Sequence, residues 1–322
     1  MSVRHVAIAG LLLSGLGAEA AAADVKSLIQ SAYAKTTSAS TMADYDSIIA
    51  LCEEARTAGP DASQQTYLRS LLSWAHNRRG ELLTEQASQL QERGEAERAA
   101  ELDGKALADF ELSIQLDRTR WKPWHNRGVS RAIAGKYDDA ISDFTQVIEL
   151  NPTYANAWFN RAEIRFDLGK LEEALDDYAE AIRLDPRDSG AYTSRAHTYF
   201  RLARYDEALR DYSEAIKLNP QDATALANRG DAYQSLGKWP EAAEDLNQAV
   251  RLQGDSARVL QSAAWLMATC PDERLRNPQI AIQAAERAVS LLGQPDARYL
   301  DTLAAAYANA GQFAQAVAKM QE

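Results

Sequence analysis

Residues 121–154 read WKPWHNRGVSRAIAGKYDDAISDFTQVIELNPTY, and the next three segments, 155–188, 189–222 and 223–256, align with them without a gap. The chain therefore repeats itself every 34 residues in this region. A fixed period of this size indicates an array of similar supersecondary units, none of which can bury its apolar face alone. These four segments decide the fold, because stacked neighbours must share one continuous core.

Small and large residues recur at fixed positions, counted from the first residue of each segment. Small residues at the eighth and twentieth positions let two helices approach closely, and large residues at the fourth and twenty-fourth fill the space beside them. The small residues are Gly128, Ala140, Ala162, Ala174, Ala196, Ala208, Gly230 and Ala242, and the large ones are Trp124, Phe144, Trp158, Tyr178, Tyr192, Tyr212, Leu226 and Leu246. A glycine marks the turn between the helices and a proline closes the second helix. These are Gly135, Gly169, Gly237, Pro152, Pro186 and Pro220.

This pattern resembles the tetratricopeptide repeat (TPR), which implies an all-α fold: a right-handed α-solenoid of stacked helix hairpins. The resemblance is strong over 121–256 and extends more weakly over about 43–322. Just upstream of 121, Gly80, Ala106 and Phe110 take the eighth, twentieth and twenty-fourth positions. About seven extra residues there, within QERGEAERAAELDGK, are expected to lengthen the first helix or its turn.

The predicted organisation has five parts. They are a signal peptide (1–23), a linker or short helix (24–42), divergent repeats (43–120), four regular repeats (121–256) and divergent repeats of which the last is incomplete (257–322). The stretch ADYDSIIALCEEA is expected to be a lone second helix. Because the last repeat stops inside its second helix without a polar cap, we expect either a fragment of a larger envelope assembly or an end that self-associates.

The first residues have the layout of a secretory signal peptide. Arg4 and His5 precede an uncharged run over 6–18, and small residues suit cleavage between Ala20 and Asp24. The alternative is an uncleaved N-terminal anchor. The stretches AAWLMATCPDERLRN and LDTLAAAYANAGQFAQAV also resemble the ends of repeat arrays in exported planctomycete-type bacterial proteins. We therefore expect an exported protein of the periplasm or cell envelope, with no integral membrane span after signal cleavage.

Five repeats carry an arginine at the seventh position and an aspartate at the twenty-third. The pairs are Arg79 with Asp109, Arg127 with Asp143, Arg161 with Asp177, Arg195 with Asp211, and Arg229 with Asp245. The following repeat has Ala263 and Ala284, so both charges disappear together. A guanidinium binds a carboxylate through two hydrogen bonds, and losing one partner strands a buried charge. We predict structural ion pairs between the two helices; the alternative is a ladder of ligand-binding arginines.

In TPR hairpins the first helix lines the inner surface, so the resemblance implies that a peptide or helix binds there. Asparagine offers both a donor and an acceptor to a peptide backbone, and phenylalanine can seat apolar side chains. The predicted groove residues are Lys122, His125, Asn126, Asn156, Phe159, Asn160, Glu163, Phe166, Ser194, His197, Phe200, Asn228 and Asp231. The alternative for the phenylalanines is packing between neighbouring repeats. The expected role is that of a non-enzymatic scaffold or adaptor for a protein or peptide.

Composition narrows the remaining function classes. The net charge of −11 argues against nucleic-acid binding, which needs a basic face. No CxxC, CxxH or HExxH motif, phosphate-binding loop or nucleophile elbow occurs, so we expect no metal, no cofactor and no catalytic residues. Cys52 and Cys270 lie several repeats apart and are expected to be buried thiols.

Overall fold

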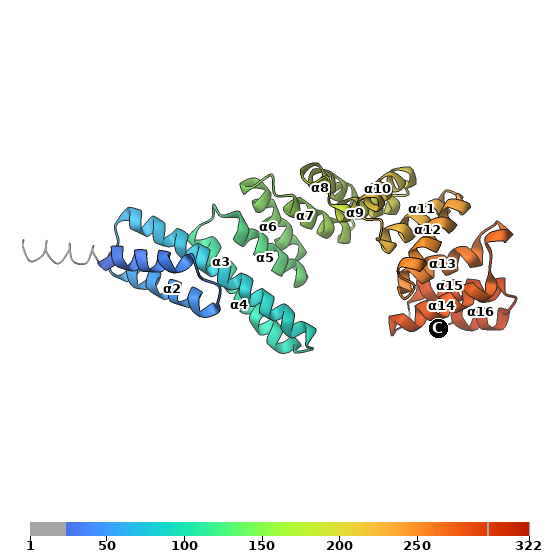
Figure 1. Cartoon of the computed structure of the whole chain (residues 1–322), viewed down its shortest axis with the longest axis horizontal. Helices are drawn as coiled ribbons and strands as arrows, with labels where there is room; N and C mark the ends of the chain where they lie inside the picture. Colours follow the sequence, from blue (N-terminus) through green and yellow to red (C-terminus); the bar gives the residue numbers. More distant parts are fainter. Residues whose placement is uncertain (1–23, 295, 322) are drawn as a thin grey trace, which may run out of the picture. The chain divides into compact units, whose positions relative to one another are not determined.

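The computed structural model describes residues 24–294 and 296–321, and within them every regular element is a helix and none is a strand (Figure 1). The chain divides into an N-terminal part, which ends at Ala157, and a C-terminal part, which begins at Trp158. The prediction of an all-α fold is confirmed. The expected signal peptide, residues 1–23, lies outside the described residues.

The N-terminal part begins with a helix over residues 24–36. It continues with α2 (Met42–Thr57), α3 (Ala62–Glu92), α4 (Ala96–Leu116), α5 (Trp121–Ile133) and α6 (Tyr137–Leu150). Thr41 is the N-cap residue of α2, and its side-chain oxygen accepts a hydrogen bond from the backbone N–H of Asp44. One core cluster joins Ala32 of the first helix to Tyr45 and Ile48 of α2. The second helix that was expected to stand alone is therefore packed against a preceding helix.

The C-terminal part continues the alternation of helices. Its elements are α7 (Ala155–Asp167), which spans the boundary, α8 (Leu171–Leu184), α9 (Ser189–Arg201), α10 (Tyr205–Leu218), α11 (Ala223–Ser235), α12 (Trp239–Leu252), α13 (Ala257–Thr269), η1 (Glu273–Leu275), α14 (Pro278–Leu292), α15 (Ala297–Asn309) and α16 (Phe313–Met320). Each hairpin packs against the next along the chain, which is the arrangement of an α-solenoid.

Close approach of the two helices explains the small residues of the repeat. A Cβ atom added to Gly128 would lie 3.1 Å from the ring of Phe144, and one added to Gly230 would lie 2.9 Å from Leu246. Glycine at the turn also has a backbone reason, since Gly135 has a φ of +72°. The repeat over 189–222 has alanine at this place, and Ala203 takes the same left-handed conformation with a φ of +57°.

The hairpin of α3 and α4 is longer than any regular hairpin. If this repeat had the regular helix lengths, α3 would end at Glu85, but the helix continues through residues 86–92. In the same way α4 would begin at Asp103, but residues 96–102 precede it within the helix. The turn between them keeps its ordinary three residues. The prediction of about seven extra residues was therefore wrong, because each of the two helices gains seven, or about two turns.

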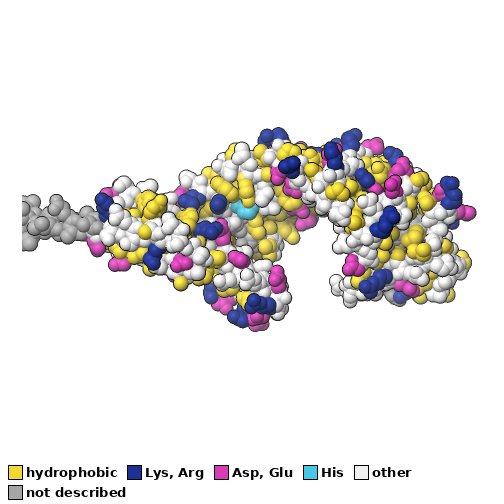
Figure 2. Space-filling view, in the orientation of Figure 1, with side chains coloured by type: hydrophobic (Ala, Val, Ile, Leu, Met, Phe, Trp, Pro, Cys, Tyr) yellow, Lys and Arg dark blue, Asp and Glu magenta, His cyan; other side chains and the backbone are white. Residues whose placement is uncertain are grey.

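Both cysteines are free thiols in the interior, as predicted: Cys52 is buried in the N-terminal part and Cys270 in the C-terminal part. Burial raises the pKa of the Cys52 thiol to about 12. On the face shown in Figure 2, acidic and basic side chains are interspersed with hydrophobic ones.

Candidate functional site

Each of the five predicted arginine–aspartate pairs is present as a two-fold hydrogen bond between a first and a second helix. In the repeat of α7 and α8, Arg161 Nε and Nη2 lie 2.9 and 2.8 Å from the two carboxylate oxygens of Asp177. The same geometry holds for Arg79 with Asp109, Arg127 with Asp143, Arg195 with Asp211, and Arg229 with Asp245. These arginines therefore join helices within the scaffold.

The buried aspartates have further partners that the sequence analysis missed. Arg131 donates to Asp143 at 2.8 Å, and Arg165 donates to Asp177 at 2.6 Å. Both arginines occupy the eleventh repeat position, so the sequence carried a signal that the prediction did not use.

His76, at the fourth position of its repeat, lies 2.7 Å from Asp109 through Nδ1. Burial by itself raises the pKa of the Asp109 carboxyl, but the hydrogen bonds from Arg79 and His76 hold it below its usual range. In three of the four regular repeats an aromatic ring takes the fourth position and covers the guanidinium, as when Arg127 lies 4.9 Å from the Trp124 ring centre.

The predicted groove residues of α5 are engaged with neighbouring side chains. His125 packs between the rings of Phe144 and Tyr154, at 5.8 and 5.2 Å between ring centres. Asn126 Nδ2 donates to Asn77 Oδ1 at 3.0 Å and to Glu81 Oε1 at 3.1 Å. Asn126 therefore joins two repeats, and this amide is not directed at a ligand.

Two other predicted residues of the N-terminal part are exposed. Lys122 lies with Nζ 5.8 Å from the centre of the Trp121 ring. Asn156 donates to the Tyr154 hydroxyl at 3.5 Å.

In the C-terminal part, the predicted residues of α7 face Tyr178. The ring of Phe159 lies 5.9 Å from it, and Glu163 accepts a hydrogen bond from its hydroxyl. Ser194 also hydrogen-bonds the Tyr178 side chain. Asn160 is half-buried and has an interaction partner of its own.

A row of rings connects α7 and α9. His197 lies 5.3 Å from Phe166 and 6.4 Å from Phe200 between ring centres, and Arg201 covers the Phe166 ring at 5.4 Å. Phe166 and His197 thus pack between neighbouring repeats, whereas Phe200 also faces open space. Burial, together with the charges of Arg258 and Arg201, lowers the pKa of His197 below its ordinary value of 6.5.

Asn228 is almost fully buried and accepts a hydrogen bond from Arg258 at 3.0 Å. Asp231 also accepts from Arg258, and from Ser262 at 3.2 Å and Gln234 at 3.1 Å. Although Arg258 opposes it, burial raises the pKa of the Asp231 carboxyl. Two of the three asparagines at the sixth repeat position, Asn126 and Asn228, are thus hydrogen-bonded to other residues of the scaffold.

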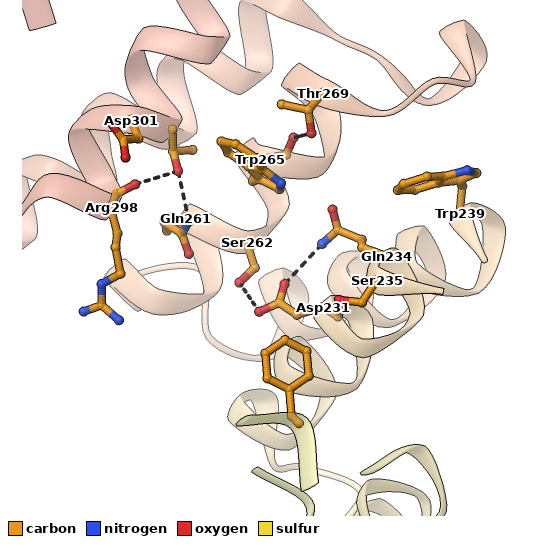
Figure 3. Close-up of a pocket in the computed structure, with 12 residues that line it drawn as sticks. Asp231, Gln234, Ser235, Trp239, Gln261, Ser262, Trp265, Thr269, Arg298 and Asp301 are labelled. Carbon is orange, nitrogen blue, oxygen red and sulfur yellow. Dashed lines mark hydrogen bonds between the residues drawn. The ribbon is translucent and has the colours of Figure 1, made fainter. Parts of the chain in front are cut away.

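An open pocket of about 460 Å³ lies on the first helices α11, α13 and α15 of the C-terminal part (Figure 3). Asp231, Ser262 and Gln234 point toward one another near its centre, and Trp265 lies to one side of them. A second pocket of about 420 Å³ shares Phe200, Asp231, Gln261 and Arg298 with it. The two pockets form a continuous recess along α9, α11, α13 and α15, which we call the C-terminal recess.

Several residues of the C-terminal recess were missed because groove residues were predicted only for the four regular repeats. Continued into α13 and α15, the same inner positions identify Arg258, Gln261, Ser262, Trp265, Arg298, Asp301 and Thr302. Trp265 is 40% exposed, which is unusual for so large an apolar side chain.

No group of three or more His, Cys, Asp or Glu side chains suited to a metal ion occurs in residues 24–294 and 296–321. Among the helices of these same residues, none has the length and apolar character that crossing a bilayer requires.

Family profiles described as Tetratricopeptide repeat match residues 126–189, 178–210 and 223–256, and one described as TPR repeat matches residues 197–237. No curated protein matches the chain.

Solved structures share the fold. PilF of Pseudomonas aeruginosa is 14% identical, with 68% of this chain and 94% of that chain covered, at a TM-score of 0.54. A tetratricopeptide repeat protein from Parabacteroides merdae is 17% identical, with 88% and 98% covered, at 0.51. The Cut9–Hcn1 hetero-tetramer of APC/C is 19% identical, with 81% and 52% covered, at 0.54. The likeness shows a shared fold, and the four matched profiles, which together cover residues 126–256, show that the chain is a tetratricopeptide repeat protein.

Proposed function

We propose that the chain is a non-enzymatic scaffold that binds an extended peptide or a helix of a partner protein in the C-terminal recess. The observation that carries the proposal is the recess itself: an open surface along four first helices, with Trp265 partly exposed in its lining. A partly exposed tryptophan beside polar groups is typical of protein-binding surfaces.

The polar lining suits a peptide backbone. Gln234 and Gln261 carry amides, which offer donors and acceptors together, and Phe200 and Trp265 supply apolar contact. Fold alone does not name a partner, so the proposal rests on these side chains.

The test begins with peptides selected from a random displayed library against the wild-type protein. Their affinities are then measured by fluorescence anisotropy for Trp265→Ala and for Ile280→Ala, a matched control, because Ile280 is exposed on α14 away from the recess. We expect Trp265→Ala to weaken binding about tenfold or more, as for a central interface residue, and Ile280→Ala to leave it unchanged. Equal affinities in both folded variants would refute the recess as the site.

The non-enzymatic role is supported by the histidines of the described residues. His76 holds Asp109, whereas His125 and His197 pack between aromatic rings. Burial also lowers the pKa of His125 from its ordinary value of 6.5, because it outweighs the hydrogen bond of Asn126 and the charge of Glu81, which raise it. His125 and His197 therefore both favour the neutral form.

We also propose that the protein is exported to the periplasm or cell envelope, with a retained N-terminal anchor as the alternative. The support is the charge pattern of the first residues, in which Arg4 and His5 precede an uncharged run. Cell fractionation and mass spectrometry of the N-terminus test it. We expect a mature end between Ala20 and Asp24; full-length protein in the cytoplasm would contradict export.

A second candidate is self-association through α16, with another copy of this chain as the occupant of its exposed face. Phe313, Val317 and Met320 lie on one side of this helix and are 68%, 57% and 69% exposed. In regular repeats the residues that correspond to Val317 and Met320 include Leu209 and Tyr212, which are buried. Light scattering over a concentration series should show dimers that Phe313→Ser with Met320→Ser abolishes; a wild-type monomer at every concentration would exclude this assembly.

A further inference from the structure

The α3–α4 hairpin and α5 border a second recess, separate from the one to which we assign the main function. The two extra turns of the hairpin carry it past the end of α5, which Figure 1 shows in the N-terminal part. The outer end of α5 has a wall of α4 residues beside it, of which Ala100 belongs to the extension and Gly104 and Leu107 to the regular part of the hairpin.

The sequence of α5 differs from the other regular first helices on the side that faces this wall. At the ninth and thirteenth positions, one turn apart, α5 has Val129 and Ile133. The equivalent residues of α7, α9 and α11 are all polar: Glu163, His197, Asp231, Asp167, Arg201 and Ser235. Ile133 is 78% exposed, so this apolar stripe is not used to pack the core.

Together α3, α4 and α5 enclose a pocket of about 500 Å³, which we call the hairpin pocket. Its walls are mostly apolar and include Leu107, Phe110, Val129, Ile133 and Ala134. This volume exceeds what one side chain fills.

The charges at the rim of the hairpin pocket have one sign. Its lining contains two acidic residues, Glu81 and Asp103, and among the described residues no lysine or arginine belongs to it. Glu81 is paired with Arg78 and with the amide of Asn126. Asp103 makes no hydrogen bond or ion pair with any described residue, and burial raises the pKa of its carboxyl. At this repeat position the regular second helices carry Tyr137, Leu171, Tyr205 and Trp239.

We propose that the hairpin pocket binds a basic, apolar segment of a partner protein, with an arginine stem against Val129 and Ile133 and its guanidinium at Asp103. The aliphatic stem of arginine packs on apolar surface while its head pairs with a carboxylate. A neighbouring apolar residue of the same segment fills the remaining volume. An acidic occupant would be repelled by Asp103, and a wholly apolar one would desolvate that carboxylate without a partner.

The proposal is tested on the full chain with three probes that share one stem: hexylguanidinium, 1-hexanol and hexanoate. Methyl NMR of protein labelled at isoleucine and valine follows Val129 and Ile133 during each titration. We expect the Ile133 methyl signal to respond to hexylguanidinium at concentrations at least about fivefold lower than to hexanol, as a partly desolvated ion pair would give, and hexanoate to bind most weakly.

Two variants then separate charge from shape. Asp103→Asn should weaken hexylguanidinium about fivefold or more and leave hexanol unchanged, whereas Asp138→Asn, an exposed acid of α6 outside the pocket, should change neither. Equal binding of the three probes by the wild type, or unchanged hexylguanidinium binding by folded Asp103→Asn, would overturn the proposal. Because the wild-type contrast stands without any variant, a misfolded variant leaves the test intact. Peptide binding at Trp265 is measured separately, so either proposal can fail alone.

Discussion

The aspartates at the twenty-third repeat position are nearly inaccessible to water, and each accepts two hydrogen bonds from an arginine of the partner helix. Asp177 is 2% exposed and accepts hydrogen bonds from Arg161 and Arg165. A buried carboxylate deprived of its counter-charge is strongly destabilising, whereas a well-packed apolar pair of similar volume is often neutral. This asymmetry explains why both charges are absent together from the repeat that has Ala263 and Ala284.

Arg161→Met should lower the free energy of unfolding by about 3–5 kcal/mol, because it leaves the carboxylate of Asp177 underpaired. The matched control is Arg183→Met, whose pair with Glu180 is exposed, and which should cost at most about 0.5 kcal/mol. Urea unfolding measures both. Adding Asp177→Leu to Arg161→Met should restore most of the loss; a further loss would mean that the pair contributes more than charge compensation.

Ala203→Gly should stabilise the protein by about 1 kcal/mol, because Ala203 holds a left-handed backbone conformation that costs a non-glycine residue about 1–2 kcal/mol. The three other regular repeats have glycine there. Thermal unfolding checks the sign, and Ala134→Gly, at the preceding position of another hairpin turn where φ is −77°, serves as the control that should not stabilise.

The two packed histidines predict how stability depends on pH. Since the pKa values of His125 and His197 are lowered in the folded protein, the unfolded chain takes up protons first as the pH falls through about 6.5. Their contribution should therefore be neutral above that pH and destabilising below it. Denaturant unfolding at pH 7.5 and 5.5 should show a smaller loss for His197→Gln than for the wild type; an equal loss would contradict the assigned shift.

At the scale of elements, the unusual feature is a hairpin lengthened by whole turns in both helices. Seven residues of helix are close to two turns, so the faces of α3 and α4 that carry the repeat pattern keep their alignment after the extension. The extension buries little beyond Ala87 and Ala99. It contributes one residue, Ala100, to the lining of the hairpin pocket.

Deleting residues 86–92 and 96–102 together should leave a folded protein with a hairpin of regular length. We expect the melting temperature to change by less than about 5 °C, because few buried side chains are lost, and circular dichroism to retain the helical signal. The response of Ile133 to hexylguanidinium should persist, because only Ala100 of the pocket lining is removed and Asp103 remains. Peptide binding to the C-terminal recess should persist as well. Deleting only 86–92 is the control, and it should unfold the hairpin because one helix then lacks its partner.

At the scale of the whole molecule, stability is distributed along the chain, since each hairpin contacts mainly its neighbours. A local defect should therefore stay local. In Arg161→Met, amide hydrogen exchange should accelerate in α7–α10 and remain at the wild-type rate in α2–α4. Uniform acceleration over all helices would instead indicate a single cooperative unit, and Arg183→Met again provides the control.

Much of the fold could be predicted from the sequence because the repeat uses local rules. The small eighth residue, the glycine turn and the proline after the second helix each act within one hairpin, and the structure has them at Gly128, Gly135 and Pro152. The arginine–aspartate pairs could be predicted for the same reason, since both partners lie in one repeat and vary together. The insertion was undercounted, because the spacing from Gly80 to Ala106 exceeds the regular spacing from Gly128 to Ala140 by fourteen residues and not by about seven.

The candidate sites depended on contacts between repeats, and these were decided by tertiary structure alone. Asn126 and Asn228 occupy inner positions that suit a ligand, yet Asn77, Glu81 and Arg258 of neighbouring repeats satisfy them. Ile133 and Asp103 gained a role in the proposed site only because the packing of α5 against the α3–α4 hairpin places both on one pocket. The sequence by itself determined the hairpin, because the pattern that specifies it lies within 34 consecutive residues. Only packing between hairpins determined which polar groups remain available to a partner, because whether a polar group is hydrogen-bonded depends on its neighbours in space.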